Sequence, residues 1–385
     1  MITPFGHLSY CSNIHTGEIW SEHFAQLKQH VPAVKAQVSP VQPMGLGLRF
    51  ANQASIDLQD FSRISELKNW LSEQNLYVFT LNGFPYGGFH NTIVKDQVHA
   101  PDWTTKDRRD YTMRLAHILS KLLTEKEGGI STSPLSYKYW WNTDEERTKA
   151  MQISTQHLLE VVDALAEIEK NTGKVIHIDI EPEPDGLLSN HGDFVAWYEQ
   201  VLLPAGNEDL IRRHIQLCFD ICHYGVSFDA PKASILELKS KNIPVGKIQI
   251  SSALRVDLRE QEAEKIAELK KYQEPVYLHQ VKALRKDGSY QEFKDLDEAF
   301  NVYQPETYDE WRVHFHVPLF LENYGLVGST QKEIRETLAI QKESPFTNHL
   351  EIETYTWGVL PAAFQVPIAD SISREIKTIQ ELLGS

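Results

Sequence analysis

Short apolar runs that end in a polar side chain recur along the chain, and helix-like stretches separate them. The clearest run, 175–180, leads to Glu181, and later runs lead to Asp220, Ser251 and Glu353. Alternation of strand and helix favours a parallel sheet, and in a closed barrel of eight such units the carboxyl ends of the strands meet at one rim. The sequence therefore predicts a (β/α)8 TIM barrel with polar side chains gathered at its rim.

The remaining strands and helices are predicted from the same periodicities. Strands are expected at 8–12, 45–50, 76–81, 129–133, 175–180, up to 220, 247–251 and up to 353. Helical spacing is found from Trp20 to Val31, around Leu67 to Leu71, and over 107–123, 143–171 and 257–271. Thr143 and Glu146 fit a capping box. The loop 83–90, rich in glycine and aromatic residues, is expected to be functional because loops at a barrel mouth usually are.

The alternation breaks after the seventh strand. Candidate strands 276–281 and 289–293 flank an Asp-Gly pair at 287–288, which is a hairpin signal, and 313–317 is a further candidate. We interpret these as an inserted β-hairpin segment within 256–349, between strands seven and eight. We expect one domain over 1–385.

Composition narrows the functional classes. The formal net charge is −15 and no basic cluster is evident, which disfavours binding to a phosphate backbone. Three cysteines do not form a disulfide framework. The N-terminus lacks the features of a signal peptide, and no run reaches the ~18 apolar residues of a membrane span. We therefore expect a cytoplasmic protein without membrane insertion.

The spacing Asp220-x-x-His223, with Glu181 one strand earlier and Glu353 on the last strand, resembles the xylose-isomerase-like TIM-barrel superfamily. That superfamily includes sugar isomerases, ketose 3-epimerases, inosose dehydratases and barrel-type AP endonucleases. The resemblance implies one divalent metal ion (Mn, Mg, Zn or Fe) bound at Glu181, Asp220, Gln249 and Glu353. Gln249 departs from the histidine that the ketose-epimerase branch has there, and an amide is a weaker donor for softer metals. His279 or His316 of the insertion could supply the missing imidazole.

The resemblance also suggests catalytic and substrate-binding residues. Glu181 and Glu353 would act as acid and base beside a carbonyl, and the alternative for both is a rim carboxylate paired with lysine or arginine. The predicted substrate-binding residues are His223, Arg255, Asn82, His15, His316 and His279. Glu183 and Asp185 are interpreted as loop carboxylates.

Four longer strings carry a second resemblance. Residues 10–18, 81–87, 314–319 and 353–357 look like the TIM-barrel member of the bacterial ebo gene cluster, a family associated with metabolite traffic. These strings are more specific than the superfamily pattern, but they imply no particular reaction. Assembly as a homo-oligomer or with other ebo-cluster proteins is left open.

The leading hypothesis is a metal-dependent isomerase, epimerase or dehydratase of a sugar, sugar phosphate or cyclitol in a secondary-metabolite pathway. Its expected partner is a small polyhydroxylated metabolite. One alternative is a barrel that binds and hands over a metabolite without turnover, which an aromatic-lined site without metal would favour. A hydrolase of the AP-endonuclease type needs more metal-binding histidines and a basic face for DNA, and no nucleic-acid partner is expected.

Overall fold

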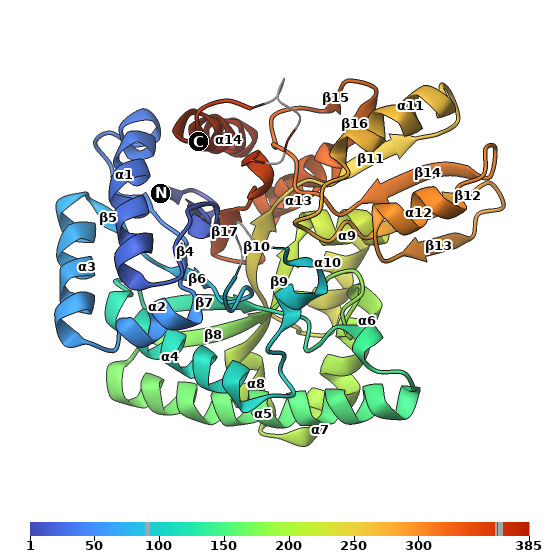
Figure 1. The fold of residues 1–385 in the computed structure, drawn as a ribbon. Helices are drawn as coiled ribbons and strands as arrows, with labels where there is room; N and C mark the ends of the chain where they lie inside the picture. Colours follow the sequence, from blue (N-terminus) through green and yellow to red (C-terminus); the bar gives the residue numbers. More distant parts are fainter. Residues whose placement is uncertain (89–92, 359, 361–364, 385) are drawn as a thin grey trace.

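The computed structural model describes residues 1–88, 93–358, 360 and 365–384. Figure 1 shows a barrel of parallel strands surrounded by helices, and within the described residues eight strand positions form it. They are β2 (Gly6–Tyr10), β4 (Leu48–Arg49), β6 (Thr80–Asn82), β7 (Glu127–Thr132), β8 (Val175–Ile180), β9 (Ile215–Asp220), β10 (Val245–Ile250) and β17 (His349–Ile352). β17 pairs with both β10 and β2, and β1 (Ile2–Thr3) pairs with β2.

The barrel closes between its first two strands. A parallel bridge joins Cys11 to Gly47, and the Ser12 amide donates to the Gly47 carbonyl at 2.8 Å. A short parallel pair, β3 (Met44–Gly45) and β5 (Leu76–Tyr77), lies just before β4 and β6 in the chain. The predicted TIM-barrel fold is therefore confirmed.

Helices cover the outside of the barrel, and the long α5 runs along the bottom of Figure 1. The helices are α1 (Trp20–Val38), α2 (Asn52–Asp57), α3 (Phe61–Glu73), α4 (Lys106–Leu122), α5 (Asp144–Thr172), α6 (His191–Trp197), α7 (Leu203–Ala205), α8 (Glu208–His214), α9 (Ile221–Ser227), α10 (Pro231–Ser240), α13 (Gln331–Glu343) and α14 (Ile368–Leu383). The predicted capping box at Thr143 and Glu146 is confirmed, and Gly173 ends α5 in the left-handed conformation. None of the helices within the described ranges is long and apolar enough to cross a membrane.

The segment between β10 and β17 forms a second, antiparallel sheet, seen at the right of Figure 1. Its strand order is β13-β12-β14-β11-β16-β15. The elements are β11 (Leu254–Asp257), α11 (Glu262–Leu269), β12 (Val281–Arg285), β13 (Tyr290–Phe293), α12 (Leu296–Val302), β14 (Tyr308–Val313), β15 (Asn323–Tyr324) and β16 (Val327–Ser329). An insertion between barrel strands seven and eight was predicted, but it is larger than one hairpin.

Two predicted strands of the insertion are wrong in position. Residues 276–280 form no strand, and the hairpin consists of β12 and β13 around the turn at Gly288. β14 ends at Val313, so the predicted strand 313–317 leaves the sheet. The His314 amide instead bonds to the Gln280 carbonyl and the Val317 amide to the Ser252 carbonyl, each at 2.9 Å. Alternating side chains indicate extended backbone, but they do not identify the partner of that backbone.

The predicted helix 257–271 starts late. Residues 254–257 pair with β14 and β16, and α11 begins at Glu262. Sheet pairing of the preceding residues therefore overrides the helical spacing of the first turn.

Inside the barrel, a buried ion pair lies one layer below the rim. Lys247 of β10 pairs with Glu351 of β17 and donates to the Ser131 hydroxyl at 3.0 Å, and both charged side chains are fully buried. Side chains two residues apart on a strand share a face, so Gln249 and Glu353 stand directly above this pair.

A second buried carboxyl group, that of Glu375, joins the C-terminal helix to two segments at the barrel mouth. Glu375 of α14 is 1% exposed and accepts hydrogen bonds from the Leu319 amide at 3.0 Å and the Thr354 hydroxyl at 2.7 Å. Burial raises the pKa of Glu375 to about 8. Glu375 thus ties α14 to the segments that follow His316 and Glu353.

Replacing Lys247 with methionine should lower the free energy of unfolding by about 3–5 kcal/mol, because the buried Glu351 carboxylate loses its cation. Urea denaturation measures the change, and Lys247→Met combined with Glu351→Leu should recover much of the loss. The control is Lys170→Met on the exposed face of α5, with an expected change within about 0.5 kcal/mol. A Lys247→Met loss as small as that of the control contradicts the assignment.

Glu375→Gln should change how stability depends on pH. The folded pKa of about 8 lies above the ordinary 4.5, so the folded protein retains a proton that the unfolded chain releases, and stability falls as pH rises between these values. We expect parent and variant to unfold at similar urea concentrations near about pH 4, and the variant to be the more stable near about pH 9. Glu381→Gln, exposed on the same helix, is the control and should track the parent. Parallel pH profiles for Glu375→Gln and the parent would refute the assignment.

Candidate metal and substrate site

A cavity opens at the carboxyl ends of the barrel strands and encloses about 510 Å³ of empty space, its open mouth included. Its lining comes from the barrel strand ends, from the loop after β6, from residues 94–98 and from the insertion. The lining residues are Asn13, Asn82, Phe84, Pro85, Val94, Lys95, Val98, Glu181, Glu183, His223, Tyr277, Leu278, His314, His316, Glu353 and Tyr355. The predicted functional loop 83–90 thus contributes Phe84 and Pro85, whereas Phe89 and His90 lie outside the described residues.

Three carboxylates converge on the floor of this cavity. Glu181, Asp220 and Glu353 follow or end β8, β9 and β17, and each offers an oxygen within 4.8 Å of the others. All three side chains are buried. The Asp220 Oδ1 accepts from the Ser251 hydroxyl at 2.6 Å and from the His223 amide at 3.2 Å. The alternation of strand and helix thus places these carboxylates together, as predicted.

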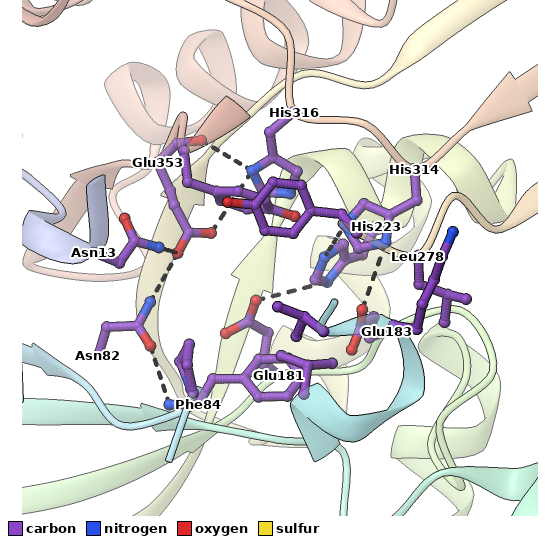
Figure 2. Close-up of a pocket in the computed structure, with 16 residues that line it drawn as sticks. Asn13, Asn82, Phe84, Glu181, Glu183, His223, Leu278, His314, His316 and Glu353 are labelled. Carbon is purple, nitrogen blue, oxygen red and sulfur yellow. Dashed lines mark hydrogen bonds and ion pairs between the residues drawn. The ribbon is translucent and has the colours of Figure 1, made fainter. Parts of the chain in front are cut away.

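Amide side chains fix the Glu353 carboxylate. Asn13 and Asn82 donate to its Oε1 at 2.6 and 2.8 Å, and Gln249 donates to its Oε2 (Figure 2 shows the two asparagines). Gln249 is fully buried behind Glu353 and is not among the described residues that line the cavity. The structure therefore places Gln249 as a donor to a predicted ligand, and its own ligation stays a prediction.

Three imidazoles face the same space, as Figure 2 shows. The Nδ1 of His223 lies 2.9 Å from the Pro182 carbonyl, and the Nδ1 of His316 lies 3.0 Å from the Glu353 carbonyl. A carbonyl can only accept a hydrogen bond, so each Nδ1 carries the proton and each Nε2 presents a lone pair. The Nδ1 of His314 lies 2.8 Å from the Gln280 side-chain oxygen, and its Nε2 lies 3.2 Å from the His223 Nε2.

Burial and mutual repulsion set the charges of the floor. Burial and the nearby Asp220 and Glu353 raise the pKa of Glu181 well above its ordinary value, and burial raises the pKa of Glu353 to about 8. Burial lowers the pKa of His316 to about 4 and that of His314 well below its ordinary value. The imidazoles are therefore neutral at pH 7, which is the form that binds metal ions.

These residues fit a divalent metal ion. The Glu181 Oε2, Asp220 Oδ2 and His316 Nε2 are buried and make no hydrogen bond within the described part of the chain. Buried polar atoms without partners are costly, and a cation satisfies oxygen and imidazole lone pairs together. Besides the three carboxylates, Asp220, His223 and His316 form a second group whose ligand atoms lie within 4.8 Å of one another. The donor set is therefore larger than the four positions that the sequence suggests.

Of the predicted substrate-binding residues, His223, Asn82 and His316 line the cavity, whereas Arg255, His279 and His15 are not among its described lining residues. Arg255 pairs with Glu310 at 2.6 Å in the inserted sheet. His279 is buried 3.2 Å from Glu274 and 3.4 Å from Asp295. His15 contacts the Tyr10 hydroxyl at 3.1 Å and stacks on His30. The substrate-binding role of these three residues stays a prediction.

Sequence reasoning missed three polar residues in or beside the site. Glu183 was interpreted as a loop carboxylate, yet it is 5% exposed and lies 3.5 Å from both His99 and His314. Asn13 donates to Glu353. Glu183 follows two residues after a predicted ligand, and this spacing was the only available signal for it. His99 and Asn13 lie in short 3-10 helices, which are too short for periodicity to locate.

Comparisons with known proteins identify the fold. No protein-family profile and no curated protein matches the chain. Among solved structures, a D-tagatose 3-epimerase-like protein has a TM-score of 0.52 at 10% identity, over 98% of this chain and 97% of that one. The IOLI protein, solved with a binding zinc atom, has a TM-score of 0.51 at 11% identity over 98% of both chains. At these identities the similarity establishes the fold alone.

Proposed function

We propose that the protein is a metal-dependent isomerase or epimerase that moves a proton beside the carbonyl of a small polyhydroxylated compound, such as a sugar or cyclitol. The observation that carries this proposal is the convergence of Glu181, Asp220 and Glu353 at the closed end of the cavity. Carboxylates at the carboxyl ends of barrel strands are where this fold places its chemistry. A dehydratase would use the same groups.

Glu181, Asp220 and Glu353 would hold the ion, with His223 and His316 as further donors. When bound, a divalent ion would act as a Lewis acid on adjacent substrate oxygens. Glu181 would bind the ion through one carboxylate oxygen and act as an acid or base through the other. Glu353 would be the second group that takes and returns the proton.

Other cavity residues would orient the substrate. Asn13 and Asn82 hold Glu353 in one rotamer through the hydrogen bonds at its Oε1. The His314 Nε2 faces the cavity 3.2 Å from the His223 Nε2 and can form a hydrogen bond with a substrate hydroxyl. Residues fixed in this way lose little freedom in the transition state, which is how positioning lowers a barrier.

The place of this reaction in secondary-metabolite processing, and membership of the ebo-cluster family, belong to the same proposal and are supported by the four sequence strings.

A barrel that binds and hands over a metabolite is the second candidate, favoured by the aromatic and apolar residues Phe84, Tyr277, Leu278 and Tyr355 in the lining. The additional imidazoles meet one requirement of the nuclease hypothesis. The net charge of −15 still opposes binding to a phosphate backbone.

Metal content is the first test. Protein purified without chelator should contain roughly one or more equivalents of a divalent metal by elemental analysis, and Glu181→Gln and Glu353→Gln should each reduce it, because each removes a charged ligand. The control, Glu145→Gln on the exposed start of α5, should keep the parent's content. A parent that takes up no metal even when supplied with manganese or zinc would reject the enzyme proposal in favour of the carrier.

Proton transfer is the second test. The metal-loaded parent should exchange a carbon-bound hydrogen of its substrate with deuterated solvent, followed by NMR over a panel of ketoses and cyclitols. Glu353→Gln should slow this exchange by ~10²–10⁴-fold, the usual contribution of a general acid or base. Equal exchange in the parent and Glu353→Gln would remove Glu353 from the chemistry.

A further inference from the structure

The cavity has two chemically different ends, and this difference bears on the substrate of the proposed function. The closed end is polar, and its side chains Glu181, Asn82 and Glu353 are at most 5% exposed. The other lining residues are mainly apolar or aromatic: Phe84, Pro85, Val94, Val98, Tyr277, Leu278 and Tyr355. A ligand that fills the cavity therefore contacts carboxylate, amide and imidazole groups at one end and mainly carbon atoms at the other.

Four of the seven apolar lining residues are partly exposed, whereas Phe84, Pro85 and Val94 are as buried as the polar floor. The partly exposed residues are Val98, Tyr277, Leu278 and Tyr355. The Tyr277 and Tyr355 rings meet edge to face at 5.1 Å, and Tyr355 lies 4.7 Å from the His316 ring. Tyr355 thus connects the floor to the rim.

The rim offers little to an anionic group. Lys95 is the sole lysine or arginine among the described lining residues, and its ammonium pairs with Asp295 at 2.6 Å. The residues outside the described ranges include no lysine or arginine in the sequence. Phosphate esters are normally recognised by arginine, lysine or free backbone amides.

Two nearby guanidinium groups are already engaged. Arg255 pairs with Glu310. Arg108 is buried outside the lining and donates to the carbonyls of Gly83 and Phe84 at 2.7 and 2.8 Å, which fixes the loop that carries Phe84. Neither guanidinium group is among the described lining residues of the cavity.

The lining carboxylates add a repulsive contribution. Glu181, Glu183 and Glu353 all face the cavity, and Asp220 lies behind them. A bound divalent ion offsets part of this negative charge at the floor, but the rim gains no cation from it. An anionic tail would therefore lie among apolar side chains within reach of carboxylates, which is unfavourable at low dielectric constant.

We propose that the substrate is an uncharged compound with vicinal oxygens at one end, which bind at the carboxylates and imidazoles, and an aliphatic or aromatic portion at the other, which packs on Phe84, Tyr277 and Leu278. This inference rests on the proposed function and narrows it. Of the sugars, sugar phosphates and cyclitols considered as substrates, the proposal excludes the sugar phosphates.

Calorimetric titration of the manganese-loaded protein tests the proposal with three probes: dihydroxyacetone, dihydroxyacetone phosphate and 1-hydroxyoctan-2-one. The alkyl probe should bind roughly 10- to 100-fold more tightly than dihydroxyacetone, since each buried methylene adds to the affinity. The phosphate should bind no more tightly than dihydroxyacetone. A tighter phosphate, or equal affinity for the alkyl probe and dihydroxyacetone, or no binding of any probe, overturns the proposal.

Matched variants place the alkyl group at the rim. Leu278→Ser should remove most of the gain of the alkyl probe and leave dihydroxyacetone unchanged, whereas Leu236→Ser, at a 57% exposed leucine of α10, should leave all affinities unchanged. If both variants retain the gain, the apolar contact lies elsewhere and the proposal fails.

Repeating the titrations after removal of the metal by a chelator distinguishes failure of this substrate class from failure of the proposed metal-dependent function. If the alkyl probe binds more tightly than dihydroxyacetone with or without metal, the proposed substrate class is supported and the metal-dependent function is not. If dihydroxyacetone phosphate binds most tightly, and only when metal is present, the metal-dependent function is supported and the proposed substrate class is not.

Discussion

The structure depends most on how buried negative charge is balanced inside the barrel. Glu181, Asp220, Glu353 and Glu351 are all buried, and the one lysine among them, Lys247, is paired with Glu351. Uncompensated carboxylates in a protein interior are expensive, so they either take up protons or attract a cation. The raised pKa of Glu353 shows the first response, and the proposed metal ion is the second.

Strand geometry arranges this charge in two layers. Lys247 and Glu351 form the lower layer, and Gln249 and Glu353 stand two residues further along the same strands. Gln249 takes no charge, and its amide holds Glu353 in place. A histidine at this position would add a metal-binding nitrogen to the floor. The glutamine amide instead donates a hydrogen bond to the neighbouring Glu353 carboxylate.

The fold and the central carboxylates could be predicted from sequence because both follow from strand periodicity. Glu181, Asp220 and Glu353 lie where apolar runs end, and parallel strands bring their carboxyl ends together whatever the loops do. The outer site could not be predicted in the same way. His314 follows a strand whose end was misplaced, and Arg255 lies on an inserted strand that commits it to Glu310. Glu183 was undervalued because a proline-rich loop is usually exposed, and here the insertion covers it.

The late position of the insertion in the chain has a consequence for biosynthesis. A ribosome delivers Glu181 and Asp220 well before residues 277–316 and Glu353, which complete the cavity. Domains fold as their residues emerge, so the half-built barrel carries acidic side chains that still face water. The ion-binding floor and its apolar rim can form only when nearly the whole polypeptide has been released. A translation product that ends before residue 277 would therefore lack Tyr277 and Leu278 of the rim and Glu353 of the floor.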